Sequence, residues 1–205
     1  MKEIITIQHA ESEQHLNGMV GSWTDWPLTE RGRRMAENVG RNLKPYLNGK
    51  EWVMYSSDLL RTKQTAECAG APSGLTPILR RELREHFFGE ACGKTMQWFY
   101  ENIRPVNTVD DRMFEGAETW RELLERVRPF AEEILASPDE HVIVVAHCDS
   151  LRAFHAIFLG LTPEDSDRVR LYAAPAGVSF LSVDEDGRRI INRLGDLSYA
   201  VKEAD

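Results

Sequence analysis

The sequence predicts an α/β protein, a three-layer α/β/α sandwich with a mainly parallel central sheet. Short apolar runs rich in β-branched residues, at residues 3–8, 52–55 and 141–146, alternate with longer amphipathic segments. The first run is apolar on both faces, which is typical of a strand buried on both sides in a parallel sheet. Strands that alternate with helices build the layered α/β architecture.

The first strand, at residues 3–8, is followed by a loop that extends to Pro27. Thr29 can cap the next helix, because a hydroxyl oxygen accepts a hydrogen bond from an N–H group of the first turn. The apolar residues of this helix recur every four positions, at Met35, Val39, Leu43 and Leu47. Pro45 lacks an N–H group, so we expect the helix to end or kink near it.

The second strand, at residues 52–55, leads into a helix at residues 59–69. Ser57 or Asp58 is expected to cap this helix, since both side chains offer an oxygen acceptor. Glycine and proline follow it closely, which is a usual signal of a helix end. A weak third strand is expected at residues 75–79.

The segment from Arg80 to Glu115 has an irregular pattern, apart from an amphipathic piece at residues 96–103. A long irregular segment in a compact domain is more often a lid or a binding element than an idle loop. We therefore expect a lid-like insert at residues 89–116 within a single domain of residues 1–205.

The second half of the chain has clearer patterns. A helix is predicted at residues 118–136 from its apolar stripe, and a Val-rich strand at residues 141–146. Asp149 or Ser150 is expected to cap the helix behind that strand. A short helix and a terminal hairpin over residues 178–191 complete the chain.

The amino-acid composition argues against some classes of binding partner. The formal net charge is −8 and no long Lys/Arg cluster occurs, which argues against nucleic acid or a membrane surface as a partner. No apolar run approaches the roughly 20 residues that span a bilayer. The N-terminus goes straight into a strand pattern, without a signal-peptide layout, so a cytoplasmic location is expected. The three cysteines are scattered, and their spacing suggests neither a disulfide framework nor a zinc site.

Three chemically suggestive residues lie near the ends of predicted strands. His9 and His147 each close a strand, and Arg61 lies in the first turn of a helix that follows one. Ligands of parallel α/β sheets gather at the carboxyl ends of the strands. Arginine offers a planar fork of donors to a phosphate, and a neutral histidine can attack phosphorus. A single histidine at a strand end is more often a core residue, so the surrounding motifs decide.

Six segments carry recognisable motifs in order along the chain. They are residues 8–12 (QHAES), 25–32 (DWPLTERG), 57–66 (SDLLRTKQTA), 83–89 (LREHFFG), 116–119 (GAET) and 144–152 (VVAHCDSLR). Together they resemble the motifs of the histidine phosphatase superfamily, also called the phosphoglycerate mutase-like family. The resemblance spans residues 4–152 and implies the phosphoglycerate mutase-like form of the α/β/α sandwich.

The resemblance implies a role for each matching residue. His9 would be the nucleophile that becomes phosphorylated, while Arg61 and His147 would bind the phosphoryl oxygens. Glu85 would protonate the leaving alcohol and then activate water. Phosphoryl transfer needs mainly positioning and positive charge around the transferred group, and arginine and histidine can supply both. No metal ion and no other cofactor is implied, and the partner is a small phosphorylated substrate.

Gln8 departs from the family, which has arginine directly before the nucleophile. Glutamine keeps two N–H donors but loses the charge, and charge-assisted hydrogen bonds are roughly twice as strong as neutral ones. The loss would cost about 2–4 kcal/mol of transition-state stabilisation if nothing replaced it. His15 and Asn17, in the loop that follows, are the candidate replacements.

Two further residues belong to the expected phosphate-binding pocket. Ser12 ends the first motif, and Cys148 stands where the family has glycine. The Cys148 side chain adds bulk behind His147, and simple packing is its favoured explanation.

Three functions compete. The first is a phosphatase that acts on a small phosphomonoester. The second is a phosphoglycerate mutase-type phosphotransferase, ranked lower because the segment from Gly89 to Gly116 is short for enclosing a bisphosphate. The third is a pseudoenzyme that only binds a phosphorylated ligand, although such a binder would not need the acid Glu85. A monomer and a homodimer are both compatible with the sequence.

Overall fold

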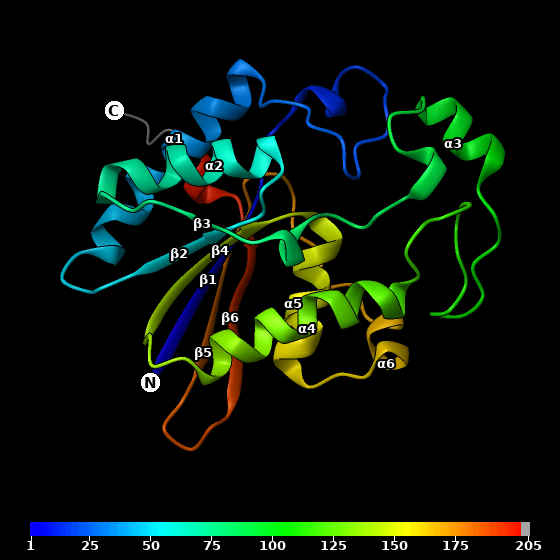
Figure 1. Ribbon diagram of the computed structural model, residues 1–205. Helices are drawn as coiled ribbons and strands as arrows, with labels where there is room; N and C mark the ends of the chain where they lie inside the picture. The colour runs from blue at the N-terminus through cyan, green and yellow to red at the C-terminus, as the bar shows by residue number, and fades with distance from the viewer. Residues whose placement is uncertain (202–205) are drawn as a thin grey trace.

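The computed structural model describes residues 1–201 and confirms the α/β/α sandwich (Figure 1). Within these residues six strands form one sheet, in the order β3-β2-β4-β1-β5-β6. The strands are β1 Lys2–Gln8, β2 Val53–Ser56, β3 Ile78–Leu79, β4 His141–Ala146, β5 Val178–Val183 and β6 Arg189–Asp196. The pairs β1–β4, β2–β4 and β2–β3 are parallel, whereas β5 and β6 are antiparallel additions. The sheet is thus mainly parallel.

Helices cover both faces of the sheet (Figure 1). Their bounds are α1 Glu30–Leu47, α2 Leu60–Gly70, α3 Met96–Asn102, α4 Trp120–Ala136, α5 Cys148–Leu159 and α6 Pro163–Asp167. One core joins α1 and α2 to the sheet, and a second core joins α4 and α5 to its other face. The cores are separate because side chains of a strand alternate between the two faces of a sheet.

The first strand shows this alternation directly. Ile5 and Ile7 pack in the core beneath α1 and α2, whereas Ile4 packs in the core beneath α4 and α5. Thr6 faces α5 as well, since its Oγ1 lies 2.9 Å from Nε2 of His155. Gln8 follows Thr6 by two positions, so its side chain also projects on the α5 side, at the carboxyl end of the strand.

Two predicted details of the first half of the chain need correction. The third strand consists only of Ile78 and Leu79, because only the last two residues of β2 pair with it. Leu59, rather than Ser57 or Asp58, occupies the N-cap of α2. The Asp58 carboxylate is instead held by Arg84 through two hydrogen bonds of 2.7 Å.

The caps of the other helices are polar. Thr29 caps α1 and accepts a hydrogen bond from Gly32, as predicted, and α1 runs past Pro45 to end at Leu47. The N-cap of α5 is His147 itself, not Asp149 or Ser150. Ser150 contributes from the third position of the helix, where its Oγ accepts a hydrogen bond from the His147 N–H at 3.1 Å.

The segment at residues 89–116, which includes α3, lies beyond the carboxyl ends of the parallel strands (Figure 1). A small apolar cluster joins this segment to the residues on either side of it, and is formed by Ala91, Phe114 and Ala117 with partly buried neighbours. Phe99 and Phe114 pack with their ring centroids 4.7 Å apart. In the part of the chain that the structure describes, no helix combines the length and apolar content needed to cross a membrane.

Candidate active site

His9 and His147 lie side by side because their strands are parallel neighbours. The register pairs Gln8 at the end of β1 with Ala146 at the end of β4, and each histidine follows directly. Both side chains are buried, and their ring centroids are 5.1 Å apart. The predicted convergence of these two strand ends is therefore present.

The hydrogen bonds of His9 assign its tautomer. Its Nδ1 lies 2.8 Å from the carbonyl oxygen of Ala10, so Nδ1 carries the proton. Nε2 is then the acceptor of a hydrogen bond from Nε of Arg61, at 3.3 Å. Burial, together with the charge of Arg61, holds the pKa of His9 well below its ordinary value. His9 is thus a neutral imidazole with its lone pair at Nε2.

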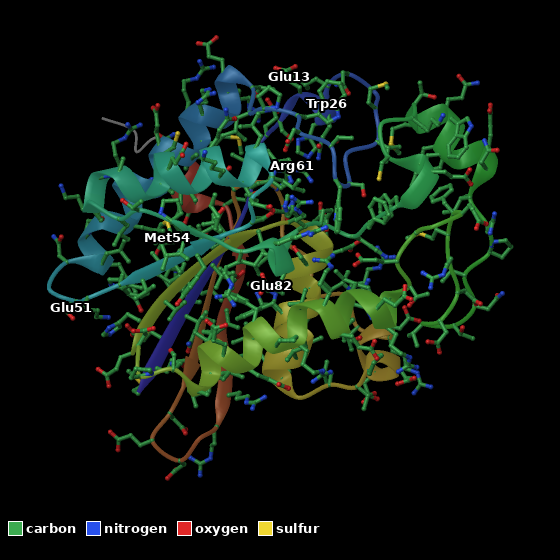
Figure 2. The ribbon with its side chains drawn as sticks, in the orientation of Figure 1. Glu13, Trp26, Glu51, Met54, Arg61 and Glu82 are labelled. Atoms are coloured by element: carbon green, nitrogen blue, oxygen red, sulfur yellow. The ribbon has the colours of Figure 1, made fainter. Side chains whose placement is uncertain are left out.

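Arg61 is a buried guanidinium anchored by backbone carbonyls. Nη1 donates to Thr24 and Nη2 donates to Ser22, each at 2.8 Å. Ser22 has a φ of 51°, an uncommon conformation for a residue with a side chain. Burial lowers the pKa of Arg61 to about 10, so the guanidinium stays charged at neutral pH. Figure 2 shows Arg61 at the start of α2, toward the loop that carries Glu13 and Trp26.

His147 is fixed at one nitrogen and unpaired at the other. Its Nε2 lies 2.9 Å from Ser57 Oγ and 3.4 Å from Thr62 Oγ1. Its Nδ1 is buried and finds no hydrogen-bond partner among residues 1–201. Burial, then the charges of Arg61 and His9, lower the pKa of His147 well below its ordinary value. A buried ring nitrogen without a partner suits an incoming phosphoryl oxygen.

Glu85 is held at the N-terminus of α5. Its Oε1 accepts hydrogen bonds from the N–H groups of His86 and Asp149, each at 3.0 Å, and of Ser150 at 3.4 Å. Burial, followed by the charge of Asp149, raises the pKa of Glu85 to about 7. A carboxyl group that stays protonated near neutral pH can serve as a general acid.

An ion pair lies next to Glu85. Nδ1 of His86 is 3.5 Å from Oδ2 of Asp149. Burial opposes both charges, but the hydrogen bond and charge of the partner raise the pKa of His86 and lower that of Asp149. The Asp149 carboxylate is therefore the negative neighbour that favours the protonated form of Glu85.

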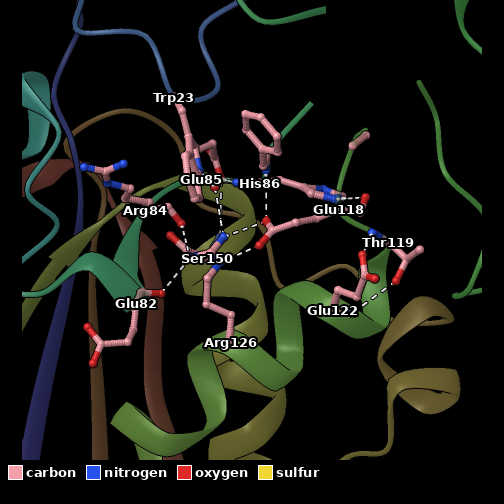
Figure 3. A network of polar contacts seen from close by, with 12 residues as sticks. Trp23, Glu82, Arg84, Glu85, His86, Glu118, Thr119, Glu122, Arg126 and Ser150 are labelled. Carbon is pink, nitrogen blue, oxygen red and sulfur yellow. Dashed lines mark hydrogen bonds and ion pairs between the residues drawn. The ribbon is translucent and has the colours of Figure 1, made fainter. Parts of the chain in front are cut away.

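Arg126, on α4, clamps the backbone that carries Glu85 (Figure 3). Its guanidinium donates to the carbonyl oxygens of Glu82, Arg84 and Glu85 at 2.8–3.0 Å. It also forms two hydrogen bonds to the Glu118 carboxylate, at 2.6 and 2.8 Å. Trp23 adds a bond from its indole N–H to the Glu85 carbonyl, at 2.7 Å.

The remaining predicted residues of the loop after β1 are Ser12, His15 and Asn17. The His15 ring stacks on His9 with centroids 5.6 Å apart, and its Nδ1 accepts a hydrogen bond from the buried Ser12. Asn17 is exposed, and its amide oxygen accepts the N–H of Met19 in its own loop. The structure therefore places Ser12 and His15 beside His9, whereas the Asn17 side chain is engaged elsewhere.

Gln8 and Cys148 flank the two histidines. Gln8 is buried, and its Oε1 has no hydrogen-bond partner among the described residues. Cys148 is the first residue of α5 and is partly buried. Burial, with the charges of Glu85 and Asp149, raises the pKa of its thiol to about 12, so the thiol stays protonated.

Several positioning residues have no signal in the sequence. Ser22 and Trp23 belong to a loop without periodicity, and their contacts depend on its final path. Arg126 sits in an amphipathic helix, where an arginine is ordinarily a solvated residue. Asp149 is expected from the sequence only as a cap, although its position two residues after His147 places it beside Glu85.

The Arg126 clamp predicts a large effect on stability. Arg126→Met should lower the free energy of unfolding by about 2–4 kcal/mol, because it removes the cationic partner of the largely buried Glu118 carboxylate and the guanidinium bonds to the carbonyls of Glu82 and Arg84. Arg128→Met is the matched control, since Arg128 only approaches Glu132 at 3.9 Å on the helix surface. Its cost should stay below about 0.5 kcal/mol. Urea unfolding measures both, and equal costs would contradict the role of the clamp.

Known proteins share this fold and sequence pattern. The chain is 31% identical over 170 residues to a 2,3-bisphosphoglycerate-dependent phosphoglycerate mutase of Methylobacterium radiotolerans, covering 78% of this chain and 80% of that protein. Among solved structures, a mycobacterial glucosyl-3-phosphoglycerate phosphatase in complex with VO3 superimposes with a TM-score of 0.82 at 22% identity, over 96% of this chain and all of that one. A putative alpha-ribazole-5'-P phosphatase of Escherichia coli gives a TM-score of 0.81 at 21% identity, over 98% and 99% of the two chains.

The sequence profile of the histidine phosphatase superfamily (branch 1) matches residues 4–195, nearly the whole chain. The six motifs, the α/β/α sandwich and the mutase relative all agree with that match. The protein belongs to the histidine phosphatase superfamily.

Proposed function

We propose that this protein is a phosphatase that hydrolyses a small phosphomonoester through a phosphohistidine intermediate. The observation that carries the proposal is the pairing of His9 Nε2 with Nε of Arg61 at 3.3 Å. This pairing presents a neutral nucleophilic nitrogen and a positive charge at one point. His147 lies beside them, and the Glu85 carboxylate accepts N–H hydrogen bonds from the first turn of the helix that His147 begins.

In the first step, the lone pair of His9 Nε2 forms a bond to phosphorus. The bond from phosphorus to the leaving oxygen breaks, and Glu85 gives its proton to that oxygen. Arg61 turns its Nε–H from His9 to a phosphoryl oxygen, and Nδ1 of His147 binds another. Charge that develops on the equatorial oxygens is stabilised by donors already in place.

In the second step, water attacks the phosphohistidine. Glu85, now a carboxylate, takes a proton from the water as its oxygen bonds to phosphorus. The bond from phosphorus to nitrogen breaks, and its electron pair returns to His9. Inorganic phosphate leaves with His9 neutral and Glu85 protonated, so the cycle is complete without another reactant.

In the proposed mechanism, Gln8 lies next to the nucleophile His9. Its buried amide can turn either its oxygen or its N–H₂ group toward a ligand. The N–H₂ group would donate to a phosphoryl oxygen, but without the charge of an arginine. The insert at residues 89–116 would serve as the lid over the leaving group, as its place beyond the strand ends suggests.

A phosphoglycerate mutase activity is the second candidate, and the mutase relative at 31% identity favours it. The same histidine would then return the phosphoryl group to a hydroxyl of glycerate instead of water. We rank hydrolysis first because a mutase must retain its bisphosphate intermediate. Gln8 stands where the family has arginine, so this site has one cationic group fewer to hold a bisphosphate. Phosphorus NMR of a reaction with 3-phosphoglycerate and 2,3-bisphosphoglycerate separates the two, since a mutase moves phosphate between positions without net release.

The nucleophile is tested by replacing His9. His9→Ala should lower kcat for p-nitrophenyl phosphate at least about 1000-fold, because the covalent route is lost. Brief exposure to substrate should leave acid-labile, base-stable phosphate on the wild-type protein and none on the variant. His141→Ala, at the opposite end of β4, is the control and should retain both signals. Equal rates of hydrolysis by wild type and His9→Ala would contradict the proposed enzyme activity. The remaining function would then be binding of a phosphorylated ligand without turnover.

The pKa of Glu85, about 7, predicts the alkaline side of the pH profile. The acid must be protonated to donate, so kcat/KM should fall as the pH rises through about 7. Asp149→Asn removes the negative charge that helps to raise this pKa, and the fall should move to lower pH. Asp186→Asn, in the β5–β6 turn, should leave the profile in place. A fall that stays at the same pH in Asp149→Asn would contradict this assignment.

Gln8→Arg tests the departure from the family. The added guanidinium should restore a charged donor, and kcat/KM for p-nitrophenyl phosphate should rise by about tenfold or more. Gln8→Leu, which removes the amide as well, should lower it. A decrease in Gln8→Arg would show that the glutamine serves a particular ligand and is not a weakened arginine.

A further inference from the structure

A cavity of about 660 Å³ lies beside the candidate active site. Its walls come from residues 86–88, from the insert, from the N-terminal turns of α4 and α5, and from the end of α6 with the loop that follows it. The cavity was not expected from the sequence, because its walls come from several separate segments of the chain. It is large enough for a small organic molecule.

The cavity lies next to the residues that surround the proposed acid, Glu85. His86 and Asp149 both line it. His86 directly follows Glu85, and the Asp149 N–H donates to Oε1 of Glu85 at 3.0 Å. Because Glu85 protonates the leaving oxygen, the alcohol portion of the substrate would extend past these residues into the cavity.

One wall of the cavity is apolar. Phe88, Val106, Met113 and Trp120 line it. The Trp120 ring is almost fully buried, and Phe88 packs against the small core of the insert. Such a wall favours a carbon skeleton over a heavily hydroxylated one, since burial of apolar surface is stabilising.

Two arginines that line the cavity, Arg152 and Arg170, have N–H donors available to a ligand. Arg152 stacks its guanidinium on Trp120 at 4.1 Å and donates from Nη2 to the Ser166 carbonyl at 3.0 Å. Its Nε is buried without a hydrogen-bond partner among residues 1–201. Arg170 also lines the cavity, and in the same described part of the chain no acidic side chain lies within ion-pair distance of it.

The acidic residues of the cavity are already engaged. Asp149 pairs with His86 at 3.5 Å, and Asp167 approaches Arg152 at 4.0 Å. Asp111 accepts N–H bonds from its own loop, at 2.8 Å. The remaining cation of the lining, Arg104, is paired with Glu115 at 3.1 Å. The positive charge left to a ligand is therefore concentrated at Arg152 and Arg170.

We infer that the cavity binds the leaving group of the substrate, and that this group has an apolar body and a second anionic group held by Arg152 and Arg170. The substrate class is thus a phosphomonoester of an apolar alcohol that also carries a carboxylate or a second phosphate. This inference rests on the proposed function, because that function places Glu85 at the leaving oxygen.

Matched substrates test the inference. The ratio of kcat/KM for 4-carboxyphenyl phosphate to that for 4-methylphenyl phosphate is measured in wild type, Arg170→Gln and Arg168→Gln. Arg168 is the control because it is exposed in the same loop and does not line the cavity. Differences in leaving-group chemistry cancel when the ratio is compared between proteins.

Loss of a charge-assisted contact should lower the ratio about tenfold in Arg170→Gln. Arg168→Gln should keep the wild-type ratio. A bisphosphate, benzene-1,4-diyl bisphosphate, replaces the carboxylate by phosphate in a second series. A preference for either anion that depends on Arg170 supports the inference, and ratios that are equal in all three proteins for both anions overturn it.

Binding separates this inference from the proposed function. Calorimetry with the non-hydrolysable 4-carboxybenzylphosphonate and benzylphosphonate needs no turnover. The carboxylated ligand should bind more tightly to wild type, and Arg170→Gln should weaken only that ligand, by about tenfold. If His9→Ala hydrolyses phosphomonoesters as fast as wild type, the proposed function fails while this comparison still stands. Equal affinities of both ligands in all proteins would overturn the inference even if hydrolysis is confirmed.

Discussion

The parallel pairing of β1 with β4 is the constraint on which the site depends. It sets Gln8 opposite Ala146, so the residues that follow, His9 and His147, emerge next to each other. Both strands are buried between two layers of helices, which leaves the carboxyl edge as the place where polar side chains can gather. Arg61 joins them because β2 pairs with β4 from the other side and delivers the start of α2 to the same edge.

Burial then sets the charge of each group. The two imidazoles are held neutral, which keeps a lone pair available, and the Glu85 carboxyl is held protonated near neutral pH. Arg61 keeps its charge because carbonyl oxygens of the loop at residues 22–24 solvate it. The same buried environment therefore leaves the two imidazoles neutral, the Glu85 carboxyl protonated near neutral pH and the Arg61 guanidinium charged, because each group responds to its own partners.

The sequence predicts the sandwich and the placement of His9, Arg61 and His147 at strand ends, since short buried strands and their following residues have a clear pattern. The same reasoning could not find the clamp at Arg126 or the carbonyls around Arg61. These contacts join segments far apart in the chain and use backbone atoms, which carry no residue-specific signal. The predicted caps of α2 and α5 were wrong for a similar reason. The Asp58 carboxylate accepts a hydrogen bond from Arg84, which is distant in the chain, and His147 itself is the N-cap of α5.

The Arg126 clamp affects which amino-acid substitutions the segment around Glu85 can accept. Three of its hydrogen bonds reach backbone carbonyls at residues 82, 84 and 85, and none of these depends on the side chains there. Substitutions at Glu82 or at Arg84 can therefore alter the surroundings of Glu85 while the main chain that carries it stays in place. The position of the Glu85 main chain is therefore independent of the side chains at residues 82 and 84, so these side chains can vary while Glu85 keeps its place.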